Sequence, residues 1–146
     1  MNVKALTEVP DLRVKDTDAV TLHVTKADNQ VVVMVNGLEV LNRRAEFNPD
    51  IHEEIPLRET LQPGMNDVNI LGIEWGGTFH YRFWMDVNGN RIPGIDRDDS
   101  GSPPHPGLIY NRRYRIFVDA DNVRRPGTLS RARTTYTQRG RLVIPS

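Results

Sequence analysis

The segment Thr78-Phe-His-Tyr-Arg-Phe-Trp-Met-Asp-Val87 decides the fold that this chain is expected to adopt. Successive side chains of a strand point to opposite faces, so one face of this segment is apolar and carries Phe79, Tyr81, Phe83 and Met85. The other face carries His80, Arg82, Trp84 and Asp86. This alternation predicts a half-buried strand whose polar face places an indole in contact with water.

Turn residues divide the rest of the chain into short strands at intervals of about 8–12 residues. Asn36-Gly37 and Asn88-Gly89 each separate two strand-like runs, which predicts type I′ hairpins. Pro63-Gly64 fits the two central positions of a type II turn. The expected strands are residues 20–25, 30–35, 38–41, 68–75, 78–87, 91–92, 108–120, 129–137 and 142–144. Within this pattern we expect residues 20–43 to form a three-stranded meander and residues 44–56 to be a long connection.

These patterns predict an all-β fold, a single antiparallel β-sandwich that is jelly-roll-like and has about 8–9 strands and little helix. The length of 146 residues suits one domain that covers residues 1–146. We expect residues 1–16 to form an N-terminal arm. Residues 93–107 are rich in Pro and Gly, which predicts a long exposed loop.

Composition excludes several classes of protein. The chain has no Cys, so disulfides, thiolate metal sites and a cysteine nucleophile are excluded. Its longest unbroken apolar run, residues 31–35, is too short to span a bilayer. No signal peptide is visible at the N-terminus. The expected location is therefore the cytoplasm by default, or export by a non-classical route.

Nineteen basic and nineteen acidic side chains cancel, which argues against a nucleic-acid-binding protein. The charges are unevenly distributed, because residues 111–146 carry nine Arg against Asp119 and Asp121, a net charge of +7. Residues 1–110 therefore carry −7. The arginines predict either contacts with an acidic protein surface or pairing with acidic strands of the same sheet. Contact between opposite charges of two copies would give a homo-oligomer.

The polar face of residues 78–87 is the candidate ligand site. A sugar ring can stack on the indole of Trp84 while His80 and Arg82 bind its hydroxyl groups. The alternative is that the second sheet, the long loop or another subunit covers Trp84. Trp75 precedes Gly76-Gly77 and either lines a pocket at the strand end or plugs the end of the core.

The segment after this strand is rich in the oxygen donors that Ca²⁺ prefers. Its candidate ligands are Asp86, Asn88, Asn90, the Ile92 carbonyl, Asp96 and Asp98. The first four match an EF-hand loop, but Arg91 replaces its glycine and Arg97 replaces its bidentate glutamate. The alternative is that these residues build the hairpin and its Asx turns. Calcium is thus the one candidate cofactor.

Two pieces of the sequence resemble galactose-binding-like jelly-roll modules. They are Val33-Met-Val-Asn-Gly37 and Leu61-Gln-Pro-Gly-Met-Asn-Asp-Val-Asn-Ile70, and the resemblance covers about residues 20–87. It implies a β-sandwich and transfers no binding residue, because folds host many functions.

The sequence thus predicts a non-catalytic carbohydrate-recognition module, assisted by calcium. A structural or protein-binding subunit of a larger assembly, such as an accessory protein of a secretion or toxin system, is the alternative. A hydrolase is the third reading, and it requires two carboxyl groups that face each other across a cleft.

Overall fold

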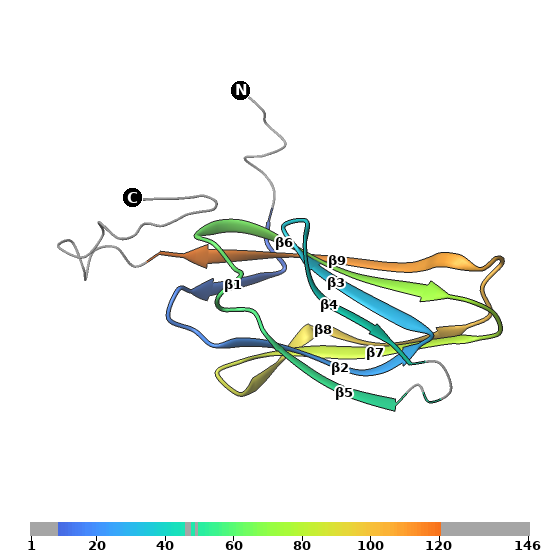
Figure 1. Cartoon of the computed structure of the whole chain (residues 1–146). Coiled ribbons are helices and arrows are strands. Elements are labelled where there is room, and N and C mark those ends of the chain that lie inside the picture. Colours follow the sequence, from blue (N-terminus) through green and yellow to red (C-terminus); the bar gives the residue numbers. More distant parts are fainter. Residues whose placement is uncertain (1–8, 46–47, 49, 121–146) are drawn as a thin grey trace, which may run out of the picture.

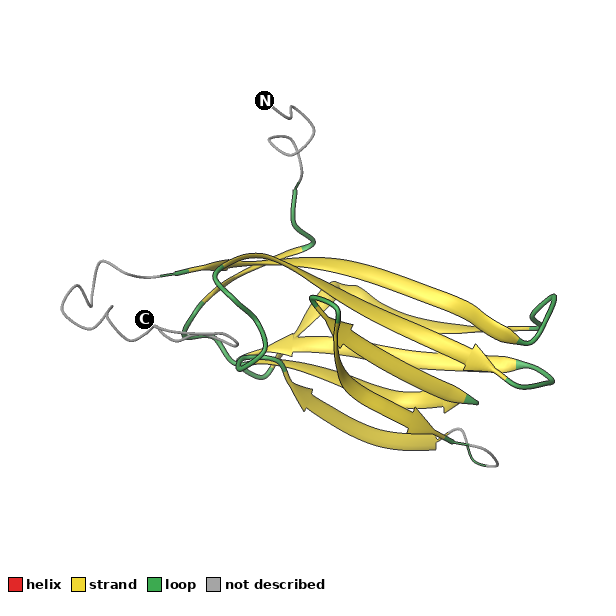
Figure 2. Ribbon diagram, turned by 45° about the horizontal axis from the view of Figure 1, so that its top comes forward, coloured by secondary structure: helices red, strands yellow, loops and turns green. Residues whose placement is uncertain are grey.

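The computed structural model describes residues 9–45, 48 and 50–120. This part of the chain contains nine strands and no helix, as Figures 1 and 2 show. The prediction of an all-β fold is confirmed.

The strands form two sheets that pack face to face as a sandwich (Figure 1). Sheet A has the order β1 (Leu12–Lys15), β9 (Gly107–Asp119), β6 (Gly64–Glu74), β3 (Gln30–Val35) and β4 (Leu38–Arg44). Sheet B has the order β5 (Asp50–Pro56), β2 (Val20–Asp28), β7 (Phe79–Val87) and β8 (Asn90–Gly101). Neighbouring strands are antiparallel except β1 and β9, which are parallel. Six of the eight connections pass from one sheet to the other, as most connections of a jelly roll do.

Both predicted Asn-Gly turns are confirmed by their backbone geometry. Asn36 and Gly37 have φ angles of 51° and 81°, and Asn88 and Gly89 have 53° and 84°. Positive φ at two consecutive residues is the mark of a type I′ turn, which matches the twist of its flanking strands. These turns close the β3–β4 and β7–β8 hairpins.

The predicted three-stranded meander over residues 20–43 is wrong. β3 pairs with β4, but β2 lies in the other sheet and pairs with β5 and β7. Only Asn29 separates β2 from β3. One residue is too short to reverse the chain within a sheet, so the chain instead crosses from sheet B to sheet A.

Three further predictions need correction. Residues 50–56, expected in a connection, form β5, because Ile51 and Ile55 point into the core from alternate positions. Residues 93–101, expected in a loop, belong to β8. β8 is an edge strand, and Pro93 has no partner in its register with β7, so the missing N–H interrupts no regular pairing, while buried Ile95 anchors the strand. Part of the expected arm over residues 1–16 is β1. The strands expected at 129–137 and 142–144 lie outside the described residues.

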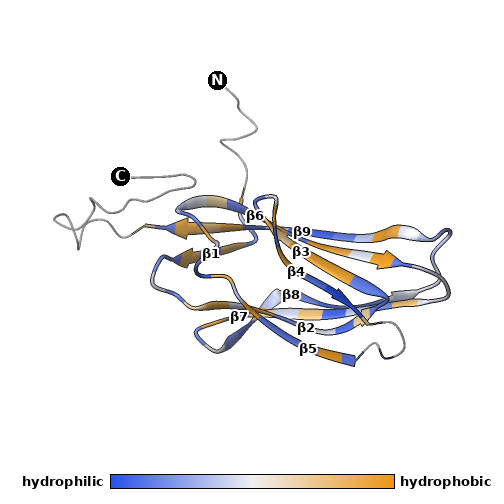
Figure 3. Ribbon diagram, viewed as in Figure 1, coloured by the Kyte–Doolittle hydropathy of each residue, from blue (hydrophilic) through white to orange (hydrophobic). Residues whose placement is uncertain are grey.

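The core lies between the sheets and includes the fully buried Leu22, Val33, Ile70, Phe83 and Ile116. Figure 3 shows the matching pattern along the chain: β3 is hydrophobic over most of its length, whereas β9 changes between hydrophobic and hydrophilic residues. Burying these side chains drives the two sheets together.

Tyr81 of β7 crosses this core and reaches sheet A. Its hydroxyl lies 3.2 Å from the carbonyl oxygen of Gln30 and 3.3 Å from that of Ile73, and donates between them. Burial raises the pKa of this hydroxyl, so it stays protonated as a donor. The ring lies against Gly72, where an added Cβ would be 2.3 Å from the Tyr81 Cζ atom. Gly72 therefore leaves the space that Tyr81 fills.

We predict that Gly72→Ala lowers the free energy of unfolding by about 2–3 kcal/mol, because the added methyl group must displace the Tyr81 ring. Urea denaturation measures the change. Gly76→Ala is the matched control, since a Cβ there meets nothing within 4 Å. A Gly72→Ala variant as stable as Gly76→Ala would contradict this view of the core.

Candidate functional site

The outer face of sheet B carries the residues predicted to bind a ligand. Tyr81, Phe83 and Met85 are buried, whereas His80, Arg82, Trp84 and Asp86 are half-buried on the opposite face of β7. The predicted assignment of faces is confirmed, and it brings His80, Arg82 and Trp84 together on one surface. The indole of Trp84 is therefore not part of the core.

Trp84 nevertheless has close neighbours on the outer face. The His23 ring of β2 stacks on the indole with the ring centroids 5.0 Å apart and an interplanar angle of 12°. The Arg91 guanidinium of β8 lies 4.4 Å from the indole centroid. Because β2 and β8 flank β7 on opposite sides, the indole is held between an imidazole and a cation. A sugar ring that stacked on it would have to displace one of them.

Ion pairs and hydrogen bonds cover the same face. His23 Nε2 donates to Asp86 Oδ2, and His80 Nε2 donates to Asp98 Oδ1, each over 2.5 Å. Arg91 pairs with Asp96 over 2.8 Å, and Lys26 pairs with Asp50. Arg91 and Asp96 both belong to β8, whereas the other three pairs join neighbouring strands, and cross-strand pairs of this kind stabilise a sheet. They also mean that Asp86, Asp96 and Asp98 each contact a basic side chain.

The predicted calcium ligands are spread along the β7–β8 hairpin. Asn88 lies in the turn, where its side chain accepts from the Ala19 amide and donates to Asp18. Asn90 begins β8, and the Asp96 and Asp98 side chains lie on the outer face of that strand. Ile92 lies in β8 between Asn90 and Asp96. The described residues hold no group of three His, Asp or Glu side chains that could bind a metal ion. Calcium binding at these residues stays a prediction.

Trp75 lies on the other side of the sandwich, on the outer face of sheet A. Its side chain is 55% exposed, so it neither plugs the core nor joins Trp84 in one site. The Arg44 guanidinium lies 5.2 Å from its ring centroid, and its backbone amide donates to Asn29 Oδ1. Structure thus separates two tryptophans that the sequence grouped together.

Further apolar residues, which the sequence analysis did not single out, lie at the same end of sheet A as Trp75. Leu108 is 55% exposed and lies opposite Ile73, and Leu71 lies two residues before Ile73 on the same face of β6. We name four residues the Trp75 patch: the exposed Trp75 and Leu108 and the half-buried Ile73 and Leu71. The sequence did contain a signal for these residues. Leu71 and Ile73 are apolar although they lie on the face opposite buried Ile70, so both faces of β6 are apolar at this end.

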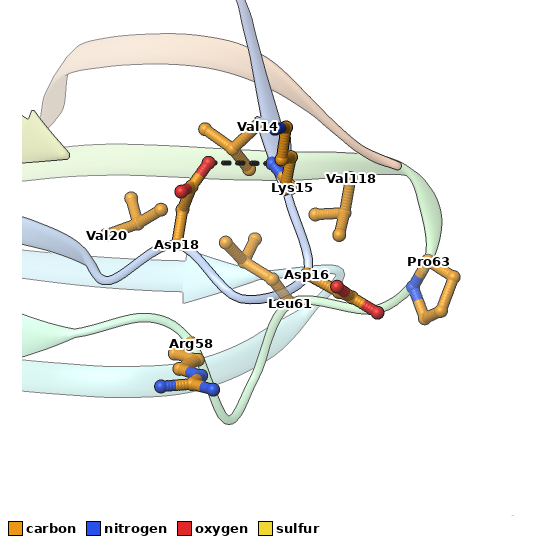
Figure 4. A pocket seen from close by; sticks show the side chains of 9 residues that line it. All are labelled: Val14, Lys15, Asp16, Asp18, Val20, Arg58, Leu61, Pro63 and Val118. Carbon is orange, nitrogen blue, oxygen red and sulfur yellow. Dashed lines mark hydrogen bonds between the residues drawn. The ribbon is translucent and has the colours of Figure 1, made fainter. Parts of the chain in front are cut away.

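A small pocket lies where β1 turns into β2, at the end of the sandwich (Figure 4). Its volume of about 50 Å³ is far below the roughly 300–1,000 Å³ of typical ligand sites. The carboxylate of Asp18 accepts a hydrogen bond from the Lys15 amide, which tightens this turn. The backbone bond to Lys15, with the side-chain bond from Asn88, lowers the pKa of Asp18. We interpret the pocket as part of the turn.

Asp99 of β8, the edge strand of sheet B, links that strand to β9 of sheet A. Arg97 donates two bonds to it at 3.0 and 3.1 Å, the Tyr110 hydroxyl donates over 2.5 Å, and Arg112 lies 3.4 Å away. Burial by itself would raise the pKa of Asp99. The bonds from Arg97 and Tyr110 and the charges of Arg97 and Arg112 together outweigh burial and lower it. The cluster is therefore a charged link between the sheets.

Comparison of the chain with family models, curated proteins and solved structures gave no match. The resemblance to galactose-binding-like modules therefore stays a prediction. Within the described residues, no helix has the length and apolar character needed to cross a membrane.

We predict that Asp99→Asn lowers the free energy of unfolding at pH 7 by about 1–3 kcal/mol, because Arg97 and Arg112 lose a charged acceptor. The pKa of Asp99 is lower in the folded than in the unfolded chain, so its contribution is present above about pH 4 and is lost as the pH falls through the folded value. The difference between wild type and variant should therefore shrink between pH 7 and pH 3, which urea denaturation measures.

Asp98→Asn is the control for this prediction. Its carboxylate is 59% exposed, so the substitution should cost less than about 1 kcal/mol. An equal loss for Asp99→Asn at both pH values would show that its charge is not what links the sheets.

Proposed function

We propose that this chain is a non-catalytic structural subunit that assembles through the Trp75 patch, and that its partner there is a second copy of the same chain. The observation that carries the proposal is that Trp75 and Leu108, two large apolar side chains, are each 55% exposed on the same face of sheet A. Ile73 lies opposite Leu108 in the register of β6 and β9, and Leu71, on the same face of β6, extends the apolar surface.

The composition of the patch supports a protein partner more than a sugar. Tryptophan and arginine are enriched among the residues that contribute most to protein interfaces, and Arg44 already contacts the Trp75 ring. Aliphatic side chains have no hydrogen-bonding groups for sugar hydroxyls. Contiguous apolar patches on a soluble protein mark interaction sites, and two-fold homodimers are the commonest assemblies.

The arginines of β9 are less suited to bind an acidic partner than the sequence indicated. Arg113 donates two hydrogen bonds to one oxygen of Asp67, at 2.9 and 3.1 Å. Arg115 lies 3.9 Å from the same carboxylate, and Arg112 contacts Asp99. These contacts favour the second of the two expectations for β9, pairing with acidic neighbours of the same protein.

We predict that the protein dimerises reversibly and that Trp75→Ala raises the dimer dissociation constant at least tenfold, about 1.4 kcal/mol, because the patch loses its largest side chain. Leu108→Glu should weaken the dimer further by placing a charge in the interface. Sedimentation velocity over a range of concentrations measures the effect.

Leu38→Glu is the matched control. Leu38 is 62% exposed, but it lies at the β3–β4 turn, away from the patch. Equal weakening by Leu38→Glu would contradict the assignment of the interface. A protein that stays monomeric up to millimolar concentration would contradict the proposal itself.

Carbohydrate recognition on the outer face of sheet B is the second candidate. It is supported by the outward position of Trp84 among histidine, arginine and carboxylate side chains that can bind hydroxyl groups. For a sugar to stack on the indole, Arg91 would have to leave it. Arg91 can do so because it is held there only by the ring and by a surface pair with Asp96.

We predict for this candidate that Trp84→Ala abolishes binding on a glycan array while lowering the free energy of unfolding by only about 1–2 kcal/mol, the size of the ring contacts with His23 and Arg91. The array is run with and without a calcium chelator. An array that is blank for the wild-type protein in both conditions would remove this candidate.

A further inference from the structure

The strands β4, β3, β6 and β9 align their side chains in rows across the outer face of sheet A. In the row nearest Trp75, the registers run from β4 to β9 through Arg44, Gln30, Ile73 and Leu108. The Trp75 ring lies at the β4 end of this row, because the Arg44 guanidinium is 5.2 Å from its centroid. Leu108 lies at the β9 end. The two exposed apolar side chains of the Trp75 patch therefore lie at opposite ends of one row.

A second row, four residues back along β6, ends in opposite charges. It runs in the same strand order through Glu39, Met34, Asn69 and Arg113. Glu39 and Arg113 are exposed, whereas the two residues between them are half-buried. Neighbouring strands are about 4.8 Å apart, so strands β4 and β9 are about 14 Å apart. Glu39 is therefore too far from Arg113 of its own chain to pair with it.

The two rows give this face the composition of a protein interface. Half-buried Ile73, Leu71 and Met34 lie on the central strands β6 and β3, and the charges of Glu39 and Arg113 lie on the flanking strands. Stable interfaces have an apolar centre and a polar rim. The face thus extends the Trp75 patch to a surface four strands wide.

A second copy can meet this face in an arrangement that matches both rows. A two-fold axis parallel to the strands, between β3 and β6, places β4 of each copy over β9 of the other. Trp75 then lies over Leu108 of the second copy, and Glu39 lies over Arg113 of the second copy. Sheets pack about 10 Å apart with their strands nearly aligned, a gap that glutamate and arginine side chains span together. Each contact occurs twice, as two-fold symmetry requires.

An axis perpendicular to the strands matches the face less well. It places each strand over the same strand of the second copy, so Trp75 and Leu108 do not meet. In the register that opposes Glu39 and Arg44, Leu108 lies over Arg113 of the second copy. Only the parallel axis joins apolar side chains and opposite charges at the same time.

Arg113 and Glu39 can form this contact without losing their partners within the chain. The Nε and Nη2 atoms of Arg113 donate to one oxygen of Asp67. A guanidinium group has more N–H donors than these two bonds use. Glu39 accepts from the Asn42 side chain over 3.4 Å, and a carboxylate accepts several hydrogen bonds.

We propose that the second copy binds through this whole face with the two-fold axis parallel to the strands, so that Trp75 packs on Leu108 and Glu39 forms an ion pair with Arg113 across the interface. The inference rests on the proposed dimer and adds to it the partner's surface and orientation. Opposite charges at an interface fix its register, so the ion pair selects this orientation.

Charge reversal tests the orientation. Glu39→Arg opposes two arginines at each of the two contacts, and Arg113→Glu opposes two glutamates. Because like charges across an interface repel, each variant should raise the dimer dissociation constant at least about tenfold. Sedimentation velocity measures the constant. Both residues are exposed, so each variant should keep the circular dichroism spectrum and the cooperative thermal unfolding of the wild type.

An equimolar mixture of the two variants is the decisive measurement. In a mixed dimer the introduced arginine faces the introduced glutamate at one contact, and the native Glu39 faces the native Arg113 at the other. The mixture should recover a dissociation constant within about threefold of the wild-type value, since opposite charges meet at both contacts. Native mass spectrometry should identify the mixed dimer. Recovery would also show that both variants are folded.

Glu54→Arg is the matched control, because Glu54 is 72% exposed on the outer face of sheet B and should not affect the dimer. A mixture that fails to recover, while Trp75→Ala still weakens the wild-type dimer, would overturn the orientation and leave the proposed function standing. Recovery by mixing Glu39→Arg with Arg44→Glu would overturn it in favour of the perpendicular axis. A wild-type protein that stays monomeric would remove both.

Discussion

The contact between Tyr81 and Gly72 fixes how the two sheets pack. Tyr81 spans the core from sheet B, and its hydroxyl donates to backbone carbonyls of β3 and β6 in sheet A. The ring fits only because residue 72 has no side chain. On its other side it stacks on Tyr110 of β9, with centroids 4.8 Å apart. One residue thus contacts three strands of the opposite sheet, and the outward faces of β6 and β7 follow from its position.

The separation of the two outer faces has a functional meaning. Alternation along β7 places Trp84 on a surface of paired charges, whereas alternation along β6 places Ile73 on the outer face of sheet A, where Trp75 and Leu108 are exposed. A charged ladder is stable in water without a partner, because most of its carboxylates contact a basic side chain. An exposed apolar patch gains free energy when it is covered. For this reason the interface is proposed at the patch.

Local signals predicted the parts of this fold that depend on neighbouring residues. Both Asn-Gly turns and the two faces of β7 follow from backbone preference and side-chain alternation within ten residues. β8 was missed because Pro93 and Gly94 normally interrupt a strand, and its pairing with β7 becomes visible only in three dimensions. The position of Trp75 depends on which sheet β6 joins, and a single-residue connection at Asn29 sends β2 and β3 to different sheets. Such long-range choices leave no periodic signal in the sequence.

The parallel pairing of β1 with β9 also determines how the domain bears tension. Leu12 lies beside Ile116 and Lys15 beside Asp119, and the Asp11 amide donates to the Arg115 carbonyl over 2.9 Å. A pull that draws the two ends of the described chain apart moves these strands in opposite directions along their own axes. The load then acts as shear on several hydrogen bonds at once rather than opening them one by one. Resistance to stretching would depend on the rate at which this short strand detaches.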